Sequence, residues 1–256
     1  MTDRSTEVDI LRSAYDAVLG RIGDACRRAS RDPGDVTLVA VSKTVDAVRL
    51  QAAVEAGITT LGENRVQEAE GKVDELTGVT WHLVGPLQSN KARRALDTFD
   101  VIQTVDSVGL AERLDRLARE DRGGGSGARY PVLLQVNVDD DPSKAGFAPV
   151  DLPAALQSLA GLDALEIRGL MTIGRLASEA EAARPTFVAL RELSERLRAG
   201  GGGPLGPALS MGMTDDFEVA VEEGATIVRV GRAIFGERPH QHVPGEPEHT
   251  HAGAGH

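Results

Sequence analysis

The sequence predicts a single (β/α)₈ TIM barrel with one extra helix in front of it. Short apolar stretches alternate with helical patterns about eight times along the 256 residues. Alternating strand–helix units build parallel sheets, and eight units in a row favour a closed barrel over an open doubly wound sheet. The hydrophobic content of 41% allows a sizeable core. Barrels of this length are routinely single domains, so one barrel accounts for most of the chain.

The first 35 residues are expected to form a helix that packs on the barrel. Apolar side chains recur every three or four residues from Val8 to Ile22, which is typical of an amphipathic helix over residues 5–31. Pro33 then stops the helical pattern, because its ring and missing N–H do not fit a helix interior.

Residues 36–239 contain the predicted barrel, whose strands are short apolar runs bounded by turn residues. We expect its eight strands at 37–43, 59–63, 80–85, 101–105, 132–138, 166–173, 208–211 and 226–231. We expect the helices between them at 45–56, 65–76, 91–99, 108–120, 150–159, 178–199 and 215–223. Glycine-rich segments at 122–128 and 200–207 are predicted to be loops.

Residues 240–256 are predicted to be a disordered tail. They hold five of the six histidines and almost no aliphatic side chain, so they cannot bury a core. His82 is then the only histidine of the barrel, and the sequence predicts no histidine-based metal site there.

The first predicted strand ends in a lysine. The period of two places Val39, Val41 and Lys43 on one face of a strand that is apolar before it. Burial disfavours the charged form of a lysine, and a neutral amine attacks an aldehyde to form a Schiff base. Only four of the 28 basic residues are lysines, so one inside an apolar strand points to amine chemistry. A lysine that simply reaches solvent remains the alternative.

The two last strands are followed by residues suited to an anion. Barrels of this kind often hold phosphates after strands seven and eight. After strand seven, Ser210 and Thr214 carry hydroxyl donors around Gly212, and Thr214 suits a helix N-cap. After strand eight, Gly231 opens the backbone and Arg232 adds positive charge. An ordinary helix cap with acidic residues in the first turn is the alternative for the first group.

Four other side chains have two interpretations each. Arg229, inside strand eight, either pairs with a carboxylate or donates to a ring nitrogen of a ligand. His82 stacks on a flat ligand or is a hydrogen-bonded core residue. Asn64 orients a ligand or caps the next helix, and Met171 forms an apolar wall of the site or plain core. A Schiff-base lysine and a phosphate site at one barrel end suggest pyridoxal 5′-phosphate (PLP).

Several motifs in order across residues 36–236 carry a resemblance to a known family. They are AVSKT at 40–44, GEN at 62–64, WHLVGPLQSNK at 81–91, SKAGF at 143–147, RGLM at 168–171, LSMGM at 209–213, VRVG at 228–231 and AIFG at 233–236. The chain resembles the pyridoxal phosphate homeostasis protein family, which has the alanine-racemase-like barrel of fold-type III PLP proteins. Together the motifs are highly specific, although most are weak singly.

The resemblance implies a PLP site and roles for its residues. It implies that Lys43 carries PLP as a Schiff base, that Arg229 faces the pyridine nitrogen and that Asn64 lies beside the ring. It implies that the phosphate is held by Ser210 and Thr214, with the backbone of Gly231 and Arg232. The whole predicted site comprises Lys43, Asn64, His82, Met171, Ser210, Met211, Gly212, Thr214, Arg229, Gly231 and Arg232. Arg232 departs from the small hydroxyl residue usual in the family, so its side chain either contacts phosphate or turns outward.

The favoured function is a PLP carrier without robust catalysis. The alternatives are a PLP-dependent amino-acid racemase or decarboxylase, and a lysine aldolase. A two-base racemase needs a second acid–base group opposite the lysine, whereas Tyr15 and Tyr130 are expected far from the strand ends. An arginine at the ring nitrogen would leave the pyridine unprotonated and weaken it as an electron sink. An aldolase of this architecture is expected to place its lysine on a later strand than the first.

Composition narrows the classes of partner that we expect for this protein. The net charge of −11 argues against a nucleic-acid surface. Cys26 is the single cysteine, so no disulfide within the chain is expected. No leader pattern and no apolar run of membrane-spanning length is seen, and we expect a soluble cytoplasmic protein. Its expected partners are PLP itself and PLP-dependent apo-enzymes, and a monomer is expected, with a dimer as the alternative.

Overall fold

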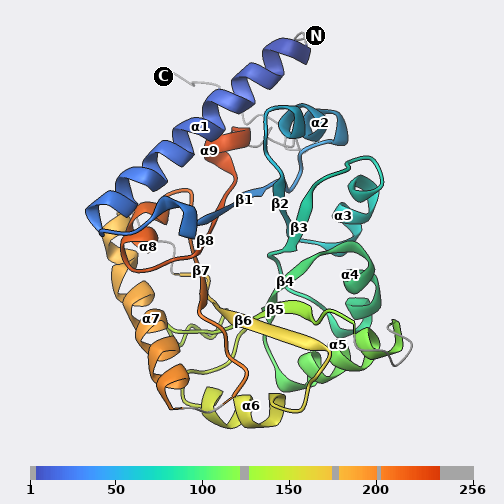
Figure 1. Cartoon of the computed structure of the whole chain (residues 1–256), viewed down its shortest axis with the longest axis vertical. Coiled ribbons are helices and arrows are strands. Elements are labelled where there is room, and N and C mark those ends of the chain that lie inside the picture. The colour runs from blue at the N-terminus through green and yellow to red at the C-terminus, as the bar shows by residue number, and fades with distance from the viewer. Residues whose placement is uncertain (1–3, 122–126, 175–178, 201–202, 237–256) are drawn as a thin grey trace, which may run out of the picture.

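The chain folds into a closed barrel of eight parallel strands, in the order β1 to β8 (Figure 1). The structure is a computed structural model and describes residues 4–121, 127–174, 179–200 and 203–236. Each strand pairs with its neighbours in the chain, and β8 pairs with β1 to close the barrel. The predicted (β/α)₈ barrel is confirmed.

All eight predicted strands are present. Their bounds are β1 Thr37–Val41, β2 Thr60–Glu63, β3 Thr80–Leu83, β4 Val101–Val105, β5 Tyr130–Gln135, β6 Leu165–Met171, β7 Ala208–Met213 and β8 Ile227–Val230. The helices are α1 Arg4–Arg28, α2 Ala47–Glu55, α3 Val66–Val73, α4 Ala92–Thr98, α5 Val108–Asp121, α6 Leu152–Leu159, α7 Arg184–Ala199, α8 Phe217–Glu222 and α9 Arg232–Phe235. Short 3₁₀ helices lie at Pro33–Asp35, Ser89–Lys91 and Ala180–Ala183.

Most element bounds differ from the prediction by a few residues. β1 ends at Val41, two residues before Lys43, because the chain turns there. α1 ends at Arg28, three residues early. α7 begins only at Arg184, after a 3₁₀ turn, and Ser178, at the predicted helix start, lies outside the described residues. The predicted tail also lies outside the described residues.

The alternation of strand side chains divides the core into two layers. On β1, Leu38 and Ala40 pack outward into the large core between strands and helices. Val39 is fully buried but is absent from that core, so it faces the barrel interior. A small cluster of Val101, Leu133 and Met171 fills part of the interior.

Helix α1 covers the seam where the barrel closes. It packs on α2, α8 and α9, which flank β1 and β8 (Figure 1). The Arg21 guanidinium lies 4.5 Å from the ring centroid of Phe217 on α8 and pairs with Glu218 at 2.9 Å. Because α1 contacts helices from both ends of the chain, it holds the last strand against the first.

A bulge in β6 brings two backbones close together. β5 pairs Val132 with Ile167 and Leu133 with Gly169, so Arg168 is an extra, exposed residue. A Cβ at Gly169 would lie 1.9 Å from the carbonyl oxygen of Ala208 on β7. Only glycine permits this approach.

We expect Gly169→Ala to lower the free energy of unfolding by at least about 2 kcal/mol, because backbone atoms of β7 cannot give way cheaply. Chemical denaturation measures the change. Gly20→Ala is the matched control: nothing lies within 4 Å of its added Cβ in the middle of α1. There we expect a gain of about 0.5–1 kcal/mol from helix propensity. Equal effects at both positions would contradict the steric account.

Candidate functional site

Lys43 lies in a tight turn at the carboxyl end of β1. The turn is closed by a hydrogen bond from the Val45 N–H to the Ser42 carbonyl, at 3.0 Å. Thr44 has φ of +67°, a left-handed conformation that is rare for a β-branched residue. Lys43 is half-buried and Ser42 is fully buried. The lysine therefore sits on a strained but anchored turn and not on the strand itself.

Residues of the two neighbouring strands lie beside this turn. Val41 pairs with Gly62 on β2, and the Ser42 N–H donates to the Gly62 carbonyl at 2.8 Å, so the end of β2 lies beside the turn that carries Lys43. On the other side, a Cβ at Gly231 would lie 3.1 Å from the Val41 carbonyl oxygen, which puts the end of β8 next to the end of β1. The structure thus brings together the ends of β2, β1 and β8.

Asn64 does not cap a helix. The N-cap position of α3 is Arg65, which makes no side-chain cap hydrogen bond. Asn64 is half-buried, and its backbone lies so close to Gly85 that a Cβ there would be 2.2 Å from the Asn64 carbonyl oxygen. Of the two interpretations of Asn64, the helix cap is therefore not observed.

The segment after β7 differs from the prediction in one respect. Thr214 is not the N-cap of α8, because that helix begins at Phe217 and its cap position is Asp216. Instead the Thr214 hydroxyl accepts a long hydrogen bond, 3.4 Å, from the Gly231 N–H. Thr214 therefore joins the loop after β7 to the end of β8.

The roles of Gly212 and Met211 on β7 are limited by the space around them. Gly212 has φ of +91°, and a Cβ there would lie 2.5 Å from that of Ala220, so only glycine fits. The Met211 side chain is fully buried in the outer core between barrel and helices. Only the backbone of Met211 can face the barrel interior.

The Arg232 side chain turns outward. It is 52% exposed and forms an ion pair with Asp215 at the surface. Of the two orientations that the sequence left open, the structure has the outward one. Any contribution of this position to an anion site comes from its backbone.

A chain of buried polar side chains crosses the barrel interior. Arg229 on β8 donates through Nη1 to the Ser210 hydroxyl of β7 at 2.6 Å, and through Nη2 to the Thr172 carbonyl at 2.7 Å. The Ser210 hydroxyl donates to Gln103 Oε1 of β4 at 2.6 Å. Gln103 Nε2 lies 2.7 Å from Nδ1 of His82 on β3. Four strands are thus linked through side chains.

The charges of this chain are set by burial. Burial lowers the pKa of His82 to about 4, with a smaller effect of the Arg168 charge, so the imidazole is neutral at pH 7. Because Gln103 uses its oxygen to accept from Ser210, its amide nitrogen donates to His82, which leaves the imidazole proton on Nε2.

Arg229 is a buried cation without an ion-paired carboxylate among the described residues. Burial lowers its pKa to about 10, opposed by the charge of Asp216, so it stays charged at pH 7. The expected default role, a salt bridge, is therefore not observed. It donates to a hydroxyl and a carbonyl, which are neutral.

Gln103 is the residue that sequence reasoning missed. It is fully buried in an all-buried strand, Val101–Val105. The available signal was a polar side chain in the middle of an apolar run, where burial without a partner is costly. Met171 is also fully buried, packed with Val101 and Leu133 in the barrel interior.

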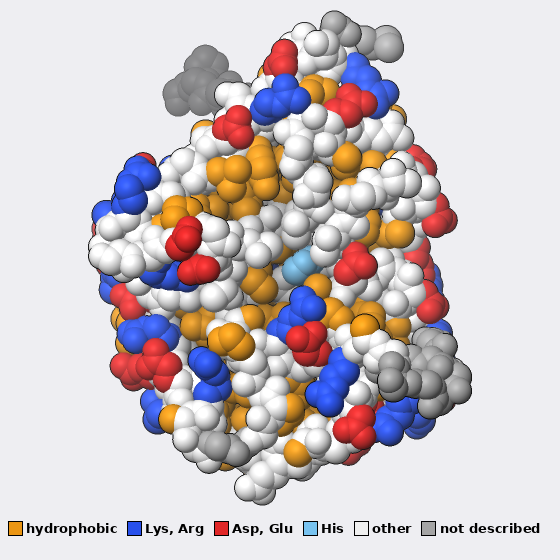
Figure 2. Space-filling view, viewed as in Figure 1, with side chains coloured by type: hydrophobic (Ala, Val, Ile, Leu, Met, Phe, Trp, Pro, Cys, Tyr) orange, Lys and Arg blue, Asp and Glu red, His pale blue; other side chains and the backbone are white. Residues whose placement is uncertain are grey.

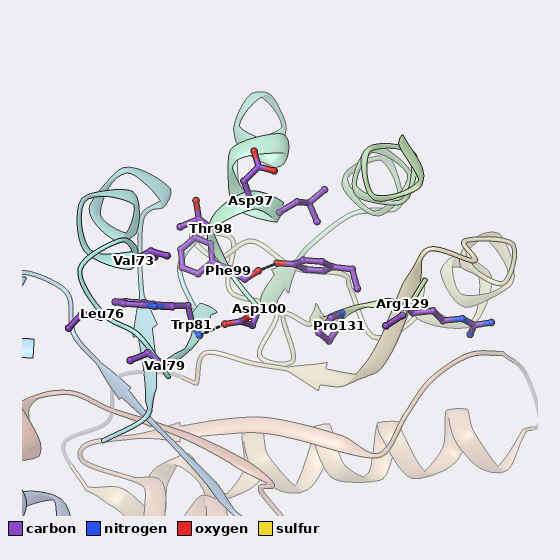
Figure 3. Close-up of a pocket in the computed structure, with 13 residues that line it drawn as sticks. Val73, Leu76, Val79, Trp81, Asp97, Thr98, Phe99, Asp100, Arg129 and Pro131 are labelled. Atoms are coloured by element: carbon purple, nitrogen blue, oxygen red, sulfur yellow. Dashed lines mark hydrogen bonds between the residues drawn. The ribbon is translucent and has the colours of Figure 1, made fainter. Parts of the chain in front are cut away.

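A cavity of about 450 Å³ lies at the opposite end of the barrel (Figure 3). It is lined by the amino-terminal ends of β3 and β5, the segment before β4 and the ends of α3 and α4. The Tyr130 hydroxyl donates to the Phe99 carbonyl within it. None of the predicted site residues lines this cavity, so it is distinct from the candidate site.

The surface and the helices give three further findings. Over the face in Figure 2, basic and acidic side chains are mixed, and no continuous basic area is seen among the described residues. No helix within the described ranges is long and apolar enough to cross a membrane. No group of three His, Cys, Asp or Glu side chains in those ranges is placed to hold a metal ion.

Comparison with known proteins identifies the family. The family model for the alanine racemase N-terminal domain matches residues 19–239. The chain is 44% identical over 223 residues to the pyridoxal phosphate homeostasis protein of Pseudomonas aeruginosa, covering 86% of this chain and 93% of that protein. It is 39% identical over 230 residues to the protein of the same name from Escherichia coli, covering 86% and 94%.

Solved structures agree. PipY of Synechococcus elongatus, solved with PLP bound, is 43% identical with a TM-score of 0.72, over 84% of this chain and all of that one. An alanine racemase of Clostridium difficile is 16% identical with a TM-score of 0.68, over 91% of this chain and 57% of that one, and shares the fold alone. The chain belongs to the alanine racemase N-terminal-domain family and, within it, to the pyridoxal phosphate homeostasis proteins.

Proposed function

We propose that this protein binds PLP, holds it as a Schiff base on Lys43 and acts in PLP homeostasis in the cytoplasm without robust catalysis. The names of the Pseudomonas and Escherichia relatives and the PLP-bound PipY structure support the ligand and the physiological role. The single observation that carries the Schiff base is the placement of Lys43 on the turn between the ends of β2 and β8.

The residues around Lys43 fit the chemical groups of PLP. Its aldehyde condenses with a lysine amine, a C=N bond replacing the C=O bond as water leaves. The hydroxyl of Thr214 and the backbone of Gly212, Gly231 and Arg232 lie at the ends of β7 and β8, where barrels hold phosphates. Asn64 is half-buried beside the lysine turn.

Arg229 fits a ring nitrogen that carries no proton. It is a buried donor that remains charged, and it donates to the neutral oxygens of Ser210 and Thr172. A guanidinium cannot accept a hydrogen bond, so a facing pyridine nitrogen would have to act as the acceptor. Ser210 is engaged by Arg229 and Gln103. We therefore assign the Ser210 hydroxyl the role of orienting Arg229. The contribution of Ser210 to phosphate binding is then assigned to its backbone.

A carrier is better supported than a racemase or decarboxylase. Tyr15 lies on α1 against the outer core, and Tyr130 lies at the amino-terminal start of β5, so neither can act opposite Lys43. An arginine at the ring nitrogen weakens the cofactor as an electron sink. His82 is neutral and engaged by Gln103. A carrier would release PLP to apo-enzymes, and we propose a monomer as the functional unit.

We expect Lys43→Ala to abolish covalent capture of PLP while the fold is retained, because no other amine then lies on the β1 turn. The measurement is the visible absorbance of the protein incubated with PLP, followed by borohydride reduction and peptide mapping. Lys91→Ala is the control, since Lys91 lies in the 3₁₀ turn before α4 and not on the β1 turn. A reducible adduct that persists in Lys43→Ala and maps elsewhere would overturn the assignment.

We expect Arg232→Thr to change the affinity for PLP by less than about twofold, because the Arg232 side chain pairs with Asp215 and faces solvent. The dissociation constant from absorbance titration checks this. Gly231→Val is the contrasting change, since a side chain there meets the Val41 carbonyl at the predicted anion site. A loss of affinity in Arg232→Thr comparable to that in Gly231→Val would mean that the arginine side chain contacts the phosphate.

A further inference from the structure

Every polar atom of Ser42, the residue before Lys43, takes part in a hydrogen bond. The Ser42 N–H donates to the Gly62 carbonyl at 2.8 Å, and its carbonyl accepts from the Val45 N–H at 3.0 Å. Its hydroxyl donates to Glu63 Oε1 at 2.7 Å. Lys72 Nζ donates to the Ser42 carbonyl at 3.2 Å. The backbone that leads into Lys43 therefore depends on two side chains outside the predicted site, Glu63 and Lys72.

Glu63 and Lys72 form a buried ion pair behind the turn. Their Oε1 and Nζ atoms lie 2.6 Å apart, and their side chains are 0% and 12% exposed. Glu63 points outward from β2, on the face of Leu61, and Lys72 reaches it from α3. Glu63 Oε2 has no hydrogen-bond partner, and burial raises the pKa of this carboxyl against the opposing effect of Lys72. Replacing both members of a buried ion pair by apolar side chains of similar volume is often neutral for stability, so stability alone does not account for this pair.

The turn that the pair supports is strained. Thr44 is held at φ of +67°, which glycine or asparagine usually occupies at this position of a turn. Strained conformations of this kind persist only where the surrounding structure determines them, and they cluster at functional sites. The anchored Ser42 is what holds this one.

We propose that Glu63 and Lys72 are positioning residues for Lys43: their ion pair fixes the Ser42 peptide and thereby the strained turn that presents the lysine amine to its aldehyde ligand. The inference rests on the proposed function, since it gives the pair a role toward the Schiff-base lysine. It gives α3, the helix that carries Lys72, a role in the site, although none of the predicted site residues lies on that helix.

The test compares two ligands in the variant Glu63→Gln/Lys72→Met, which removes both charges together and so leaves no unpaired buried ion. PLP carries the aldehyde, and pyridoxine 5′-phosphate carries the same ring and phosphate with an alcohol in its place. Affinity is measured for each by titration. Hydrogen–deuterium exchange of the Val45 amide in the ligand-free protein reports the turn directly.

We expect the affinity for PLP to fall by about tenfold or more, the affinity for pyridoxine 5′-phosphate to change by less than about twofold, and the Val45 amide to exchange faster. Equal losses for both ligands would mean general damage to the barrel end and would overturn the inference. Unchanged affinities would overturn it as well. A wild-type protein without a reducible adduct at Lys43 would instead overturn the proposed function, and the inference with it.

Two further variants sharpen the result. Arg119→Met removes the cation that pairs with Asp115 at 2.6 Å, on α5 away from β1. The Asp115 side chain is 6% exposed. This control should leave both affinities unchanged. Adding Thr44→Gly to the double variant relieves the positive φ without restoring the ion pair. We expect partial recovery of the PLP affinity, and no recovery would exclude strain in the turn as the property that the pair maintains.

Discussion

The site depends on how the end of β1 is fixed. Ser42 is the last residue before the lysine, and strand pairing, a turn hydrogen bond and a buried ion pair all converge on it. Each of these contacts comes from a different part of the chain: the neighbouring strand, the turn itself and α3. Because a lysine side chain is long and flexible, its amine can be directed only by fixing the backbone that carries it. The strained Thr44 is a consequence of that fixing.

The barrel interior supplies the second constraint, a buried cation held by neutral groups. Removing a guanidinium from water is costly unless its donors are satisfied, and here Ser210 and Thr172 provide two acceptors. Ser210 is itself hydrogen-bonded to Gln103, which also contacts His82. The hydrogen-bonded chain that orients Arg229 therefore includes side chains from four strands. Such a chain tolerates few changes, since each member satisfies its neighbour. It also keeps part of the interior polar, directly beside the apolar cluster of Val101, Leu133 and Met171, because Met171 pairs with Ser210 and Val101 with His82.

Much of this could be predicted from the sequence. The eight strands and the position of Lys43 at the end of the first follow from local patterns, because a buried parallel strand needs an uninterrupted apolar run. The family motifs add the ligand. The errors have local causes. Thr214 suits an N-cap by residue type, but the helix begins later, at Phe217. The orientation of the Arg232 side chain was left open by the sequence, and its pairing with Asp215 decided it. Gln103 carries no motif and gains its role only from Ser210 and His82, which lie far from it in the chain.

The sequence by itself therefore determined the barrel, the order of its elements and which strand end carries Lys43, because hydrophobic periodicity and strand length are local properties of the chain. Only the tertiary structure decided which polar side chains meet. In the sequence, Lys72 belongs to a predicted helix and carries no motif that marks it for function. It becomes a partner of Glu63 and Ser42 because α3 packs on the ends of β1 and β2. Side-chain partners across a barrel are set by register and closure, and these depend on all eight strands at once.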